Sequence, residues 1–106
     1  MKKIVINDIS YEVVKENGEA IDIELLTEKI TDYFDDFDYI VGDWAYGKVR
    51  LKGFYESDNK KCNKINDIKL LDDYIANNCA YGCKWFLIKR NKWLKTIFFF
   101  VIILGE

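Results

Sequence analysis

The stretch 38–55 constrains the fold of this chain more than any other part of the sequence. In residues 48–53, cations alternate with aliphatic or small side chains, which is the period of a half-buried strand. Residues 39–41 are aromatic and β-branched, and they predict another strand just upstream. We expect the two strands to pair around a three-residue loop, Ala45-Tyr46-Gly47, in which Gly47 adopts a positive φ.

The requirement that the aliphatic side chains of both strands share one face sets the register of this hairpin. An odd loop length meets that requirement and places Trp44 opposite Lys48 and Val41 opposite Leu51. The core face is then predicted to carry Tyr39, Val41, Val49, Leu51 and Gly53. The outer face is predicted to carry Ile40, Gly42, Trp44, Lys48, Arg50 and Lys52.

The predicted outer face brings an indole together with three cations. Trp44 would lie beside Lys48, Arg50 and Lys52, with Gly42 leaving room and Tyr46 at the turn tip. Sheet faces of this kind stack bases and contact phosphates in proteins that bind single strands. We therefore predict single-stranded nucleic acid or a ribonucleoprotein as the favoured partner. The alternative is that a helix covers Trp44 and that the cations only solvate the surface.

The remaining elements follow from hydrophobic periodicity. Strands are predicted over 3–6 and 9–15, around the turn pair Asn7-Asp8, and over 83–89, where apolar residues on both faces indicate an interior strand. Helices are predicted over 21–37, capped by Asp22, and from Asp67 to about residue 79. We expect an α+β domain over residues 1–90, ordered β-β-α-β-β-α-β. Its sheet should be mostly antiparallel, with both helices on one face.

Two blocks of this sequence resemble the YutD-like family, whose members are small uncharacterised proteins of low-GC Gram-positive bacteria. The first block is residues 38–44 followed by Tyr46-Gly47 and 50–54, and the second comprises Asp73-Tyr74 and 79–83. The similarity spans about residues 9–89. It implies a small α+β domain and no known activity. The motif residues with a structural explanation are Gly42, Asp43, Gly47, Gly53, Cys79, Gly82 and Cys83. For Asp43, hydrogen bonds to its own loop amides are favoured over catalysis.

Composition argues against most enzymes and metal sites. The chain has no histidine, which removes the commonest general base and metal ligand, and it has no nucleophile or phosphate-loop motif. Cys79 and Cys83 are spaced C-x3-C, which differs from the C-x-x-C spacing of a redox pair. Cys62 is the only further cysteine, so the chain lacks the four Cys or His ligands that a zinc site normally uses. The acidic cluster near residues 32–38 lacks calcium-loop spacing. We expect no cofactor, and a cytoplasmic protein whose cysteines stay reduced.

Charge is unevenly distributed along the chain. Residues 7–43 contain 12 acidic and 2 basic side chains, whereas residues 44–106 contain 12 basic and 6 acidic ones. We favour an acidic helix packed beside a basic sheet, because mixed-sign surfaces are ordinary. The alternative is a polar interaction surface, which would suit an adaptor that binds proteins through the acidic helix or the tail.

The tail, residues 91–106, is the least constrained segment. Residues 97–104 are apolar without a break, yet a spanning helix needs about 20 apolar residues and cations lie just upstream. Three interpretations remain open. The tail is an extra buried strand, a segment that dimerises or touches membrane, or the product of a frameshift. This apolar tail departs from the family that the sequence resembles, whose tails tend to be charged.

Overall fold

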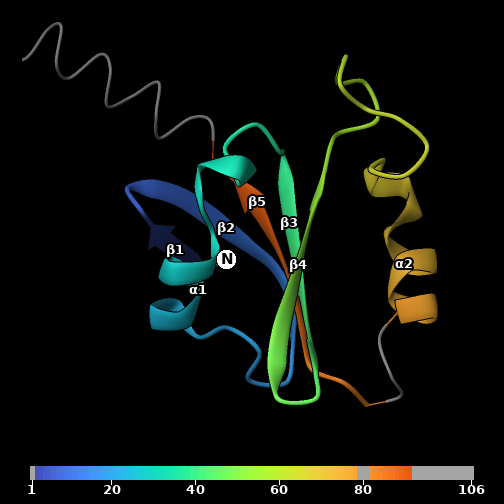
Figure 1. Ribbon diagram of the computed structural model, residues 1–106. Coiled ribbons are helices and arrows are strands. Elements are labelled where there is room, and N and C mark those ends of the chain that lie inside the picture. The colour runs from blue at the N-terminus through green and yellow to red at the C-terminus, as the bar shows by residue number, and fades with distance from the viewer. Residues whose placement is uncertain (1, 79–81, 92–106) are drawn as a thin grey trace, which may run out of the picture.

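The elements follow the predicted order within residues 2–78 and 82–91, which the computed structural model describes (Figure 1). Strands β1 (Lys3–Ile6) and β2 (Ile9–Asn17) precede helix α1 (Ile23–Lys29) and the 3-10 helix η1 (Asp32–Phe34). Strands β3 (Tyr39–Ala45) and β4 (Lys48–Phe54) come next, followed by the 3-10 helix η2 (Ile68–Leu70), helix α2 (Leu71–Asn78) and strand β5 (Trp85–Arg90). The predicted β-β-α-β-β-α-β order of an α+β domain is confirmed.

The strands form one antiparallel sheet in the order β1-β2-β5-β3-β4. β5 lies between β2 and β3, as its apolar residues on both faces predicted. β5, the last strand within the described residues, therefore joins the N-terminal hairpin, β1-β2, to the central hairpin, β3-β4. Neither hairpin would bury both of its faces alone, so β5 makes the two hairpins into one domain.

Helix α1 is shorter than the sequence predicted. Asp22 caps its start, where a carboxylate oxygen accepts a hydrogen bond from the Leu25 amide at 3.2 Å. The helix ends at Lys29 because Ile30 is extended, and the chain then makes the separate short turn η1. The Asn7 side-chain amide donates to the carbonyls of Thr27, at 3.2 Å, and Ile30, at 2.8 Å. This contact from the β1–β2 turn satisfies carbonyls at the helix end, so the predicted helix over 21–37 is wrong beyond residue 29.

The two helices cover opposite faces of the sheet, so the prediction that both lie on one face is wrong (Figure 1). On the α1 face, α1 and η1 cover the larger core, which includes Tyr11, Ile40, Phe86 and Ile88. On the α2 face, α2 and η2 cover Val41, Phe54 and Leu87. The physical reason is that β3 and β5 carry apolar side chains on both sides. A single helical layer would leave one of these sides in water.

Two glycines allow aromatic rings to lie directly on the sheet. A Cβ atom at Gly42 would come within 2.2 Å of the Phe86 ring, and one at Gly53 within 2.3 Å of the Phe37 ring. No real side chain tolerates such distances. The prediction that these glycines have a backbone role, and no need of a ligand, fits this close approach.

Replacing Gly42 with alanine should lower the free energy of unfolding by about 1–3 kcal/mol, because the fully buried Phe86 ring must move. Urea denaturation followed by tryptophan fluorescence measures the change. Gly47→Asn is the matched control. It sits at a positive φ with nothing within 4 Å of the added Cβ atom, so it should cost less than about 1 kcal/mol. A Gly42→Ala variant as stable as the parent would contradict this packing.

Some predictions fall outside the described residues. Cys79 and the apolar run 97–104 lie there, and so does the tail except for Asn91, whose amide donates to the Ser10 carbonyl at 2.9 Å. Among the helices that the structure describes, none has the length and apolar character needed to cross a bilayer.

Candidate functional site

The turn of the central hairpin contains two residues, and the predicted three-residue loop is wrong. Ala45 pairs with Lys48, and Tyr46 and Gly47 between them have φ values of 54° and 76°. Two successive positive φ values are typical of a type I′ turn, whose twist matches that of the flanking strands. The sequence did not reveal this turn because tyrosine rarely adopts a positive φ.

The shorter turn shifts the register of β3 against β4 by one residue. Trp44 lies opposite Val49, and Asp43 lies opposite Arg50. The alternation within each strand is as predicted, but the shift means that the residues of β3 and β4 predicted to share a face lie on opposite faces. The α1 face carries Ile40, Gly42, Trp44, Val49, Leu51 and Gly53. The α2 face carries Tyr39, Val41, Asp43, Lys48, Arg50, Lys52 and Phe54.

Trp44 does not join the cations. It packs partly buried against the core of the α1 face, and its indole N–H donates to the Ala20 carbonyl at 2.8 Å. The Lys84 ammonium lies 4.7 Å from the centroid of the indole ring. The premise that Trp44 shares a face with Lys48, Arg50 and Lys52 is wrong. The chain leading into α1 engages the indole, which is close to the alternative that the sequence left open.

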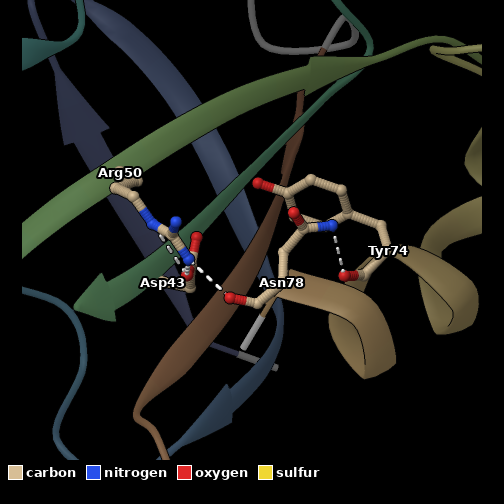
Figure 2. A network of polar contacts seen from close by, with 4 residues as sticks. All are labelled: Asp43, Arg50, Tyr74 and Asn78. Atoms are coloured by element: carbon tan, nitrogen blue, oxygen red, sulfur yellow. Dashed lines mark hydrogen bonds and ion pairs between the residues drawn. The ribbon is translucent and has the colours of Figure 1, made fainter. Parts of the chain in front are cut away.

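Asp43, which is fully buried, takes the place of Trp44 on the face that carries the cations. Figure 2 shows its carboxylate beside the Arg50 guanidinium. Its carboxylate accepts hydrogen bonds from the Arg50 guanidinium, at 3.2 Å for Nε and closer for the terminal nitrogen. That terminal nitrogen also donates to the Asn78 carbonyl at 2.6 Å, at the end of α2. The side-chain amide of Asn78 in turn donates to the Tyr74 backbone carbonyl at 2.9 Å.

This network holds helix α2 onto the sheet. The Arg50 cation bridges a buried carboxylate on β3 and the carbonyl of the last α2 residue, where the helix dipole favours positive charge. The hydrogen bond to Asp43 raises the pKa of Arg50, and burial raises the pKa of Tyr74. The expectation that Asp43 bonds its own loop amides is wrong, since its partner is the cation across the strand pair. Asp43 is therefore a buried member of a hydrogen-bond network that spans β3, β4 and α2.

The other two cations remain on the surface of the α2 face. The Lys52 ammonium lies 5.2 Å from the centroid of the Phe54 ring and 5.8 Å from that of Tyr74, and Lys48 is exposed near the turn. Tyr46 is fully exposed at the turn tip. Of the predicted nucleic-acid contacts, the structure therefore brings Tyr46, Lys48, Arg50 and Lys52 to one end and edge of the sheet.

A small hollow lined by both polar and apolar groups lies along the outer edge of β4, and little in the sequence indicates it. It measures about 170 Å³ and is lined by Tyr33, Phe34, Phe37, Leu51, Lys52, Gly53, Ile65 and Asn66. Tyr33 is 69% exposed and Ile65 is 72% exposed, although both are large apolar residues. The one hint in the sequence is Ile65 itself, an aliphatic residue inside the polar loop 56–66. We call Tyr33, Phe37, Leu51 and Ile65, together with the outer backbone of β4, the β4-edge surface.

A larger hollow of about 500 Å³ lies at the end of the sheet away from the β3–β4 turn, and its charges largely neutralise one another. It is lined by Lys3, Glu12, Asp38, Glu56, Lys89, Arg90 and Asn91. The Tyr39 hydroxyl donates to Glu56 at 2.8 Å, and Lys89 pairs with the same carboxylate at 3.4 Å. Burial, reinforced by this hydrogen bond, raises the pKa of Tyr39 to about 12. Because both signs of charge line this hollow, it offers no clear attraction for an anion or a cation.

The cysteines differ in state. Cys62 is a free thiol, whereas Cys83 is disulfide-bonded, one residue after Gly82, which has a φ of 77°. The expectation that every cysteine stays reduced is therefore wrong for Cys83. That expectation rested on the cytoplasmic location inferred from the sequence.

The comparisons with known proteins agree with one another. The family model described as "Putative antitoxin YutD-like" matches residues 5–89. "Putative antitoxin YutD" of Bacillus subtilis (strain 168) is 38% identical over 87 residues, which are 82% of this chain and 96% of the relative. The solution NMR structure of protein yutD from B. subtilis matches with a TM-score of 0.71 and 36% identity, over 87% of this chain and 84% of that one. This chain therefore belongs to the YutD-like family, as the residues of the central hairpin suggested.

Proposed function

We propose that this chain acts by binding another protein, which it contacts along the β4-edge surface. The observation that carries the proposal is the pair of exposed large side chains, Tyr33 and Ile65, that flank the hollow beside β4. Large apolar side chains gathered around a hollow are typical of protein-binding surfaces, where an anchor side chain of the partner fills the space.

The name of the B. subtilis relative supports a protein partner. It is called a "Putative antitoxin", and an antitoxin is by definition a molecule that counteracts a toxin. Direct binding is the simplest way for a chain of 106 residues without histidine to do so. We propose that the partner of this chain is a toxin protein, which the chain counteracts by binding it directly.

Nucleic acid, the partner favoured from the sequence, becomes the second candidate. The row of Lys48, Arg50 and Lys52 still supports it, and Tyr46 at the turn tip is available for stacking. Two observations weaken it. Trp44 is engaged on the other face, and the Arg50 charge is already paired with Asp43.

Site-specific photo-crosslinking tests the proposal. A photoreactive phenylalanine analogue replaces Tyr33 in the full chain, and the control carries the same analogue at Val5. Val5 is also exposed, at 58%, but lies on β1 at the far edge of the sheet. We expect the Tyr33 position to crosslink one protein that the Val5 position does not. The purified partner should then bind the Ile65→Asp variant at least about ten-fold more weakly than the parent chain.

Two results would overturn the proposal. One is a Tyr33 crosslink that yields nucleic acid and no protein, together with an affinity for single-stranded RNA that falls steeply as salt is raised. The other is an identified partner whose affinity is unchanged by Ile65→Asp.

A further inference from the structure

The backbone groups on the outer side of β4 lie at an edge of the sheet. The Trp44 amide donates to the Lys84 carbonyl at 3.0 Å and the Arg90 amide donates to the Asp38 carbonyl at 2.9 Å, so even-numbered residues of β3 bond to β5. Odd-numbered residues of β3 then bond to β4, where their partners are Lys48, Arg50 and Lys52. It follows that the N–H and C=O groups of Val49, Leu51 and Gly53 point away from the sheet.

The chain itself shows that this edge accepts another segment. Just after the end of β4, the Tyr55 amide donates to the Asn66 carbonyl at 2.7 Å, and the Ile68 amide donates to the Tyr55 carbonyl at 2.9 Å. Tyr55 has the same parity as Val49 and Leu51, so these bonds lie on the outer side of β4. Over the described ranges 2–78 and 82–91, the edge from Val49 to Gly53 has no such neighbour.

Side chains on the two faces of this edge differ in character. On the α2 face, Lys48 and Lys52 present their ammonium groups on either side of Arg50, whose charge is paired with Asp43. On the α1 face, Val49 and Leu51 are partly buried, and Leu51 lines the hollow together with Tyr33, Phe37 and Ile65. A strand laid along the edge would therefore meet positive charge on one face and apolar surface on the other.

Building on the proposed protein-binding function, we propose that an extended segment of the partner adds to β4 as a further strand of the sheet. Its carboxylates face Lys48 and Lys52, and an aliphatic or aromatic side chain on its other face fills the hollow beside Leu51. Main-chain hydrogen bonds from Val49 and Leu51 hold the segment, and the alternate side chains select its sequence.

A second copy of this chain is a poor occupant of the same edge. Two β4 strands paired edge to edge would bring the cations of one copy close to those of the other. Like charges opposite one another destabilise a strand pair, and edge lysines are a common defence against self-association. The same cations favour a segment rich in carboxylates, so charge complementarity identifies the partner as acidic.

Hydrogen exchange measured by NMR tests this inference with a defined probe. The probe is the acetylated, amidated peptide Glu-Val-Glu-Phe-Glu-Val-Glu, and its control has lysine at each glutamate position. In the chain alone, the amides of Val49 and Leu51 should exchange much faster than those of Arg50 and Lys52, which bond to β3. Saturation with the acidic peptide should slow exchange at Val49 and Leu51 by at least about ten-fold. The lysine peptide should not.

A charge exchange provides the matched variant. Lys48→Glu should weaken binding of the acidic peptide by about two- to five-fold and strengthen binding of the lysine peptide. Lys48 is exposed near the turn, so the fold should tolerate the change.

Three outcomes would overturn strand addition: no binding of the acidic peptide at about 1 mM, binding without protection of Val49 and Leu51, or protection in the chain alone through self-pairing. None of them decides whether the chain binds a protein, because crosslinking from Tyr33 answers that question separately.

Discussion

Replacing Arg50 with methionine is expected to destabilise the domain more than any other single change on the hairpin surface. The variant keeps the aliphatic stem but leaves the Asp43 carboxylate fully buried without its cation. A buried charge without a counterion is among the costliest defects in a folded protein. The loss also frees the Asn78 carbonyl, which Arg50 otherwise binds at the end of α2. Urea unfolding near neutral pH measures the effect.

Asp43→Asn is the matched control for this prediction. The amide remains neutral in the buried site and loses only the charge-assisted bonds with Arg50, so we expect a loss of about 2 kcal/mol. The Arg50→Met loss should exceed that value. Adding Asp43→Asn to Arg50→Met should recover stability, because the orphaned charge disappears. A double variant less stable than Arg50→Met alone would contradict the assigned role of Asp43.

Replacing Trp44 with alanine is expected to lower the free energy of unfolding by about 3 kcal/mol. The indole packs against the core of the α1 face and ties the Ala20 carbonyl to β3, so the variant loses apolar contacts and a hydrogen bond together. Chemical denaturation followed by far-UV circular dichroism measures the change without relying on the deleted fluorophore.

Trp44→Phe separates the two contributions to this loss. Phenylalanine keeps most of the apolar contact and removes the N–H donor, so its cost should be about 1 kcal/mol. The same variant tests the original nucleic-acid hypothesis. If Trp44→Phe folded normally but lost an affinity for single-stranded RNA that the parent possessed, the indole would have to face a ligand.

The hairpin illustrates how far the sequence could be interpreted. Alternation in residues 48–53 and the β-branched run before the turn predicted the strands β3 and β4, and the structure confirms both. The register depended on the length of the turn. Tyr46 adopts a positive φ, and this single residue shortens the loop and moves Trp44 away from the cations. The backbone preference of tyrosine disfavours a positive φ, so the pairing of β3 with β4 must impose this turn conformation.

The β4-edge surface could not be predicted for a different reason. Tyr33 and Ile65 are 32 positions apart in the sequence, and both meet β4 only after η1 and the loop 56–66 have been placed. No periodic pattern connects residues on separate loops. Only Ile65, as an isolated aliphatic residue in a polar segment, gave a sign that something apolar lies there.

The sequence by itself determined the order of the elements, the helix caps at Asp22 and Asp67, and the interior position of β5. Each of these depends on short-range periodicity or on a side chain bonding to its own backbone neighbourhood. The tertiary structure alone decided that the helices lie on opposite faces and that Asp43 pairs with Arg50. It also decided that, among the described residues, no strand pairs with the outer edge of β4 beside the hollow flanked by Tyr33 and Ile65. These features depend on contacts between residues far apart in the chain, which form only when burial of both faces of the sheet fixes the register.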